Sequence, residues 1–317
     1  MTQSGLPTWG VVAQVKASAA AVETFVAWHL ERGASRIVIY FDDPDDPAAA
    51  GLARLAPRVA AVRCDAAHWA ALKPRRPGRK TGRQTANAQQ AYDAAQVDWL
   101  AHVDVDEFIV PLRFDGMAEA PRVADMLAET PAGKVMVRLR PYEALAEPGG
   151  GEPRHFRTTP LSGPDRANRV TRVYGPYAEA LADGMLSHSV GKTFARTGVA
   201  GLAPRIHVPR IHDGPVRGVA FSRSMVLVHY HAVDRADWLS QLDYRTELGA
   251  YSGRPASKAF FAGAGPGELA AFHQAVQIAT PELLDRLGRE GLLMTGAPAL
   301  AEARARVFGV PGRPTSR

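Results

Sequence analysis

The sequence contains a single cysteine, Cys64, among its 317 residues. One thiol excludes an internal disulfide and any zinc site built from several cysteines, and it is typical of a reducing compartment. The sequence also lacks a run of about 18 apolar residues, so we expect no membrane span. Its first residues show no basic stretch followed by an apolar one, so we expect no secretory signal and a cytoplasmic location.

Internal repeats and long low-complexity segments are absent as well. Hydrophobic residues make up 46% of the chain, which is enough core for one large domain or two modest ones. The net charge of +6 favours anionic partners such as nucleic acid, anionic lipid or phosphorylated small molecules. Basic residues cluster only at 73–83 and in the tail 304–317. A partner-binding patch and a solvated basic surface are both open interpretations there.

The first 64 residues alternate between strand and helix patterns. Apolar and β-branched runs predict strands at 11–15, 36–41 and 59–64, with a helix over 19–32 that Gly33 ends and a weak helix at 48–55. This alternation predicts an α/β fold with a mostly parallel sheet flanked by helices. In such sheets ligands bind outside the carboxyl ends of the strands, and the acidic loop 42–47 follows the second strand.

The richest acidic cluster follows a later apolar run. After a basic loop at 73–82 and a helix at 84–96, the sequence predicts a strand over 99–109 that carries Asp104, Asp106 and Glu107. Alternate residues of a strand share a face, so we expect Asp104 and Asp106 on one side. Two adjacent carboxylates are tolerated when a divalent cation lies between them, and oxygen ligands suit Mg²⁺ or Mn²⁺. A solvated turn is the alternative interpretation.

The second half of the chain is more irregular. We predict one catalytic domain over 1–245 and a C-terminal helical extension over 246–317 packed on it. Asp234 is expected to cap a helix that carries Trp238. The remaining predicted elements are strands at 135–139, 191–195 and 225–231, a long loop at 146–166, and a helical end at 281–308.

Three further features suggest ligands. His229 and His231 lie at strand spacing, and imidazole suits Mn²⁺ better than Mg²⁺, so one of them could complete a metal site. Lys192 could neutralise a diphosphate. Arg83, near the start of a helix that follows several cations, could belong to a phosphate cradle. A surface lysine and a solvated basic loop are the alternative interpretations.

Four stretches together resemble the glycosyltransferase family 2-like enzymes, in the bacterial branch whose fold is called GT-A. The resemblance covers roughly residues 10 to 245, and its most specific part is the Asp-Val-Asp-Glu-Phe motif at 104–108. The stretches are Val15-Lys16 with the helix through 25–30, the strand and acidic loop 37–46, the segment 98–108, and His229-Tyr230 leading to the Asp234 helix.

The resemblance implies a metal-dependent transfer of a sugar from a nucleotide-sugar donor to a glycan, glycolipid or protein acceptor, with Mn²⁺ or Mg²⁺ as cofactor. It assigns Asp104 and Asp106 to the metal. It assigns Asp42, with Asp43 beside it, to the nucleotide. It places His229 at a late metal or diphosphate position, with His231 as the competing residue. The sequence departs from the family where Ala17-Ser18 replaces the common Asn-Glu, and where the second loop reads Asp42-Asp43-Pro44-Asp45-Asp46.

An inverting transfer would need a general base, and the sequence offers Asp213, Asp243 and Glu247. We take Asp213 as the working choice. The sequence does not choose between inversion and retention.

Two other functions use the same features. A metal-dependent phosphohydrolase or nucleotidyltransferase could use the aspartate pair. A phosphatase with an aspartate nucleophile, however, would carry Asp-x-Asp-x-Thr after its first strand. Here the acidic cluster follows a later strand, and Phe108 stands at the position of the threonine. A basic nucleic-acid-binding protein would show clustered basic faces with stacking aromatic residues. Neither is clear, so we expect no nucleic-acid partner, whereas peripheral membrane association stays open.

Overall fold

The computed structural model describes residues 5–112, 121–161, 163–212 and 214–309. The chain divides into two compact units. The first unit comprises residues 1–139, 192–227 and 299–317, and the second comprises 140–191 and 228–298. The chain therefore passes between units at 139–140, 191–192, 227–228 and 298–299. None of these points is the boundary at 245, and the division into a catalytic domain and an extension stays a prediction.

The first unit is built on a mixed sheet. Strands β3, β2, β1 and β4 are neighbours in that order and run parallel, β8 pairs antiparallel with β4, and the first residues of β6 pair antiparallel with β8. The predicted α/β class and the parallel pairing of the early strands are confirmed. The strands are β1 Trp9–Val15, β2 Arg36–Phe41, β3 Val59–Arg63, β4 Trp99–His102, β5 Glu107–Pro111, β6 Met136–Ala144, β8 Lys192–Arg196 and β12 Phe221–His229.

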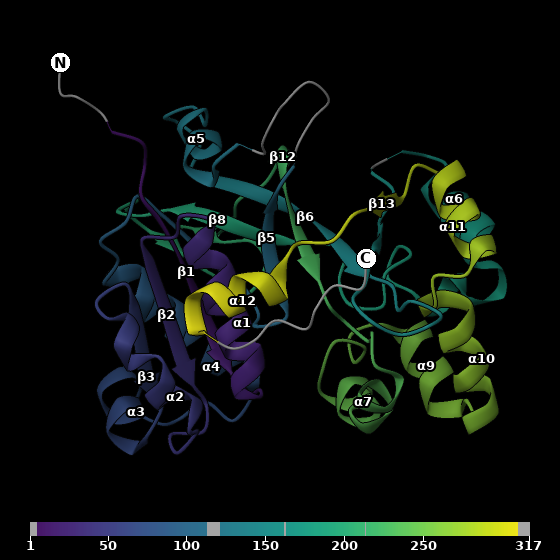
Figure 1. Cartoon of the computed structure of the whole chain (residues 1–317), viewed down its shortest axis with the longest axis horizontal. Helices are drawn as coiled ribbons and strands as arrows, with labels where there is room; N and C mark the ends of the chain where they lie inside the picture. The colour runs from purple at the N-terminus through teal and green to yellow at the C-terminus, as the bar shows by residue number, and fades with distance from the viewer. Residues whose placement is uncertain (1–4, 113–120, 162, 213, 310–317) are drawn as a thin grey trace. The chain divides into compact units, whose positions relative to one another are not determined.

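Helices flank this sheet. Helix α1 begins where the Ser18 side chain accepts a hydrogen bond from the Ala21 amide (3.3 Å), and it ends just before Gly33, whose φ of 95° suits glycine. The C-terminal helix α12 lies against α1, as Figure 1 shows. The helices are α1 Ala19–Glu31, α2 Ala48–Gly51, η1 Ala53–Leu55, α3 Ala66–Leu72, α4 Lys80–Asp93, α5 Val123–Ala128 and α12 Leu300–Phe308; β9 Leu202–Ala203, β10 Arg210–Ile211 and β11 Gly214–Pro215 form a small second sheet.

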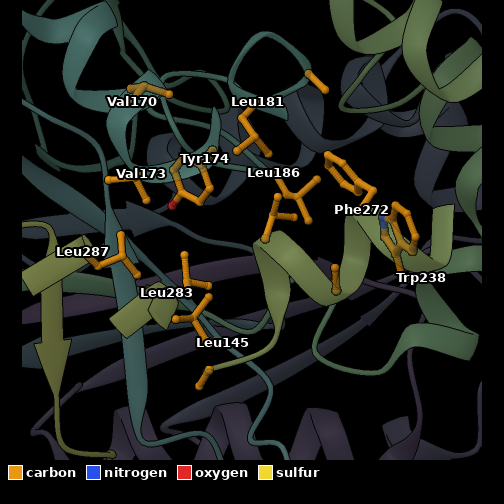
Figure 2. Packing of buried hydrophobic residues seen from close by; sticks show 14 of the residues in the cluster. Leu145, Val170, Val173, Tyr174, Leu181, Leu186, Trp238, Phe272, Leu283 and Leu287 are labelled. Atoms are coloured by element: carbon orange, nitrogen blue, oxygen red, sulfur yellow. The ribbon is translucent and has the colours of Figure 1, made fainter. Parts of the chain in front are cut away.

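The second unit combines a short antiparallel sheet with helices. The last residues of β6 pair with β7, and β7 pairs with β13. Its aromatic core includes Trp238 and Phe272, whose rings stack with centroids 6.1 Å apart (Figure 2). Its elements are β7 His155–Thr158, α6 Arg166–Tyr174, η2 Gly175–Ala180, α7 Arg235–Ser240, α8 Leu242–Glu247, α9 Pro255–Gly263, α10 Pro266–Gln277, α11 Pro281–Arg289 and β13 Leu293–Thr295.

Local chemistry explains where the sequence was right and wrong in this unit. The predicted cap of α7 is confirmed, because the Asp234 side chain accepts a hydrogen bond from the Asp237 amide (2.8 Å). The prediction of a helical end over 281–308 is wrong, because Gly291 and Gly296, with φ of 61° and 114°, flank strand β13 between α11 and α12. The predicted loop at 146–166 contains strand β7.

Across the described ranges, we find no helix that combines the length and the apolar character needed to cross a bilayer.

Candidate functional site

The carboxyl ends of the four parallel strands carry polar residues. Gln14 is the penultimate residue of β1, and Asp42, Cys64 and Asp104 follow the ends of β2, β3 and β4. Parallel strands of a sheet end at one edge, and ligands of open α/β sheets bind outside that edge. The order of the strands therefore gathers four polar side chains of the first unit where a ligand is expected.

Helix α4 covers these residues with polar side chains. The amide of Gln84 donates to Asp104 Oδ1 (2.7 Å), and the amide of Asn87 donates to Gln14 Oε1 (2.8 Å). Both amide residues are buried. The helix begins at Lys80, four residues before the start expected from the sequence. Its inward face is thus occupied by a hydrogen-bonded network rather than by apolar packing alone.

Asp42 is held by two arginines. Arg83 donates from Nε to Asp42 Oδ1 (2.7 Å) and from Nη2 to Oδ2 (2.8 Å), and Arg76 donates to Oδ1 (3.0 Å). Burial raises the pKa of Asp42, but the two guanidinium groups outweigh it and lower the pKa below its usual value. The ionised carboxylate therefore fixes Arg83 beside the strand ends. Asp43 is exposed and accepts a hydrogen bond from the Asp45 amide (3.0 Å), so it shapes the loop instead.

The acidic cluster lies on a turn. The prediction of one strand over 99–109, with Asp104 and Asp106 on the same face, is wrong, because β4 ends at His102 and β5 begins at Glu107. The Glu107 amide donates to the Asp104 carbonyl (3.0 Å), which closes the turn. The Glu107 side chain in return accepts from the Asp104 amide (2.8 Å). Asp104 and Asp106 are both partly buried. We call residues 104–107 the acidic turn.

Lys192 is the cation of the acidic turn. Its side chain is fully buried, and Nζ lies 2.6 Å from Asp104 Oδ2 and 3.2 Å from Glu107 Oε2. Burial lowers the pKa of Lys192, but the two carboxylates outweigh it and raise the pKa. The pKa of Asp104 lies well below its usual value, because the charge of Lys192 outweighs the effect of burial. Lys192 thus contacts protein carboxylates, and its expected role toward a diphosphate stays a prediction.

A pocket opens beside this network in the first unit. Its volume is about 470 Å³, which falls within the usual range for small-molecule sites. It is lined by Pro44, Cys64, Asp65, Ala66, Trp69, Ala70, Lys73, Pro74, Arg75 and Arg76. Burial raises the pKa of the Cys64 thiol to about 11, so this group is a neutral part of the wall. The pocket therefore combines an apolar wall with cations from the loop before α4.

The second unit holds the two predicted histidines. Strand β12 ends at His229, so the expectation that both histidines share a strand face is wrong. His229 Nδ1 lies 3.0 Å from Ser187 Oγ, and His231 Nε2 lies 3.1 Å from Tyr251 Oη. Both rings are buried, with centroids 5.2 Å apart. Each ring is thus held by a contact with a hydroxyl.

Glu143 and Arg157 were not singled out from the sequence. They face each other across β6 and β7, and both side chains are fully buried. Glu143 Oε2 accepts from Arg157 Nε (2.8 Å) and from the Leu186 amide (2.9 Å), and Oε1 accepts from the Ser187 amide (2.7 Å). Glu143 thereby holds the backbone of the serine whose hydroxyl contacts His229. Neither residue lies in a strand predicted from the sequence, because Glu143 follows the strand expected at 135–139 and Arg157 lies in the loop expected at 146–166.

Three carboxylates are candidates for the general base. Asp213, our working choice, lies outside the described residues. Asp243 and Glu247 are exposed on α8 of the second unit, and Glu247 pairs with Lys258 (3.3 Å). The structure therefore assigns no base.

No known protein-family model matches the chain. No curated protein matches its sequence at a significant level.

Proposed function

We propose that this protein is a metal-dependent glycosyltransferase with a GT-A type fold, which transfers a sugar from a nucleotide-sugar donor to a glycan, glycolipid or protein acceptor in the cytoplasm. The observation that carries the proposal is the placement of the acidic turn after β4 and of Asp42, with its bound Arg83, after β2. Both lie at carboxyl ends of strands in the parallel part of the mixed sheet, the edge at which such folds bind nucleotides.

In this proposal the first unit binds the donor. Arg83, fixed by Asp42, and the other cations of the basic loop would contact the donor phosphates, because guanidinium groups match phosphate oxygens in geometry and charge. The pocket of about 470 Å³ beside Asp42 would take the nucleoside. The excess of cations in this region supports an anionic ligand over a neutral one.

The acidic turn would hold the metal ion. Its carboxylate oxygens fit Mn²⁺ or Mg²⁺, which commonly bridge one or two carboxylates to substrate phosphates. Such an ion stabilises the negative charge that develops on the departing nucleoside diphosphate. Asp106 offers its carboxylate from the partly buried part of the turn, while Asp104 is held by Gln84 and Lys192. Asp104 would orient the turn and approach the ion through the oxygen lone pairs that remain.

The test is a calorimetric titration of UDP and of GDP into the protein, with and without Mn²⁺. We expect one of the two nucleotides to bind only when Mn²⁺ is present. Asp106→Ala should abolish the metal-dependent part of binding. Asp93→Ala removes a similar carboxylate from the exposed end of α4 and should bind like the wild type.

Other outcomes would redirect the proposal. Folded wild-type protein that binds neither nucleotide under any condition would overturn it. Salt-sensitive binding of DNA or RNA in that case would support a nucleic-acid-binding protein. Hydrolysis of a phosphate ester without binding of either diphosphate would support a phosphohydrolase.

A further inference from the structure

Lys192 occupies the position that a cation is expected to take among these carboxylates. Its ammonium group lies 2.6 Å from Asp104 and 3.2 Å from Glu107, and it is sealed from solvent. Two neighbouring carboxylates repel each other unless a positive charge lies between them. Here the protein supplies that charge from strand β8, 88 residues further along the chain.

Asp104 is engaged at both of its carboxylate oxygens. Both oxygens of Asp104 accept hydrogen bonds, Oδ1 from Gln84 (2.7 Å) and Oδ2 from Lys192 (2.6 Å). Glu107 Oε2 accepts from the Asp104 amide as well as facing Lys192. The lysine therefore offsets one of the negative charges that would attract a divalent ion, and it engages Oδ2 of Asp104.

We propose that Lys192 is a built-in cation that keeps the metal affinity of the acidic turn low until a nucleotide diphosphate supplies further oxygen ligands. Metal and nucleotide then bind as a coupled pair, because each provides charge that the other needs. The inference rests on the proposed function for the identity of the nucleotide. The effect of Lys192 on the affinity for the metal does not depend on the proposed function.

The experiment measures Mn²⁺ affinity by electron paramagnetic resonance, with and without the nucleotide that the wild type binds. In the wild type we expect weak binding of Mn²⁺ alone and at least about a tenfold gain with nucleotide, a coupling of ordinary size. In Lys192→Met we expect Mn²⁺ alone to bind at least about tenfold more tightly, because a buried positive charge next to the site is gone. The gain from nucleotide should shrink accordingly.

The matched control is Lys134→Met, which removes an exposed lysine of the same unit and should leave both affinities unchanged. Lys192→Arg keeps the charge and should restore weak binding of Mn²⁺ alone. Unchanged or weaker binding of Mn²⁺ alone by folded Lys192→Met would overturn the inference.

Lys192→Met could fold poorly, since it leaves Asp104 and Glu107 without their cation. The double variant Lys192→Met/Glu107→Gln also removes one negative charge and should recover thermal stability. If Lys192 acts as the cation, added Mn²⁺ should raise the melting temperature of Lys192→Met much more than that of the double variant. Equal shifts in the two would contradict the inference. This comparison needs no nucleotide, so a failure of the proposed function is distinguishable from a failure of the inference.

Discussion

Each of the two units buries one cation completely, as far as the described residues show: Lys192 in the first and Arg157 in the second. Their surroundings differ. Lys192 faces Asp104, whose side chain is 27% exposed, whereas Arg157 pairs with a fully buried Glu143. Arg157 also donates to Gln277 Oε1 (2.8 Å) and to the Val276 carbonyl. A partly open carboxylate beside a buried cation is accessible to a ligand, whereas a carboxylate enclosed together with its cation serves the fold.

The charged residues of the chain are also distributed unequally between the two units. Of the 38 lysines and arginines, 26 lie in the first unit, as do 18 of the 32 aspartates and glutamates, which leaves 12 and 14 for the second. The first unit is therefore strongly basic and the second slightly acidic. Attraction of an anionic ligand is thus a property of the first unit, and the following predictions test this separation of roles.

The largest effect is expected from Arg157→Met. Removing one partner leaves Glu143 as an uncompensated buried charge, which should lower the free energy of unfolding by about 3–5 kcal/mol. Burial alone would raise the pKa of Glu143, and it is Arg157 that holds this pKa below its usual value. Urea unfolding followed by tryptophan fluorescence measures the loss, because Trp238 is one of the buried tryptophans. Unlike Lys192→Met, this variant should gain no stability from Mn²⁺. A gain would contradict the difference in role between Lys192 and Arg157.

The double variant Glu143→Met/Arg157→Met sharpens the same point. It removes both charges and should recover much of the stability that Arg157→Met loses, since apolar residues often replace a buried pair at little cost. The same unfolding titration measures the recovery. A double variant as unstable as the single one would show that the hydrogen bonds from Glu143 to the Leu186 and Ser187 amides carry the stability instead.

The next effect is a pH dependence located in the first unit. Burial lowers the pKa of His29 from 6.5 to about 4, and it outweighs the hydrogen bond to the Phe25 carbonyl (2.8 Å), which raises the pKa. The unfolded chain takes up the proton first as pH falls, so His29 contributes stability above pH 6.5 that is lost toward pH 4. At about 1.4 kcal/mol per pKa unit, the loss amounts to roughly 3 kcal/mol.

Unfolding titrations at several values of pH check this contribution. His29→Leu should flatten the dependence between pH 6.5 and 4, and the matched change at exposed His212 should not. An unchanged slope in His29→Leu would assign the acid sensitivity to other groups.

The smallest effect is expected from removing a helix cap in each of the two units. Asp234 accepts from the Asp237 amide at 2.8 Å, whereas Ser18 accepts from the Ala21 amide at 3.3 Å. Asp234→Ala should cost about 1 kcal/mol, and Ser18→Ala less, because its hydrogen bond is longer. Thermal unfolding of both variants measures the difference, and the reverse order would contradict it.

Local pattern was sufficient for much of the first unit. The strand expected at 36–41 has those bounds in the structure, because its β-branched and aromatic residues leave no competing helix pattern. Gly33 and Asp234 marked helix ends because their conformational and hydrogen-bonding preferences act within a few residues. The α/β class followed from the alternation of such local signals.

Long-range contacts decided what the sequence could not predict. Residues 99–109 have strand-like composition, but the turn at 104–107 is stabilised by Lys192, which is 88 residues away from Asp104. Strand β7 lies in a stretch rich in proline and glycine, and its Arg157 is anchored by Glu143 and Gln277. The candidate site was located by its carboxylates, whereas the partners of those carboxylates became visible only in the folded chain.

The central claim is that the first unit binds a nucleotide-sugar with a metal and releases the nucleoside diphosphate. The most direct measurement is donor hydrolysis, in which water takes the sugar. UDP or GDP released from a panel of UDP- and GDP-sugars incubated with the protein and Mn²⁺ is followed by chromatography. We predict release from one nucleotide class, loss of release on chelation, recovery with added Mn²⁺, and no release by Asp106→Ala. Release that is equal in Asp106→Ala, or no release from any donor together with no nucleotide binding, would contradict the account.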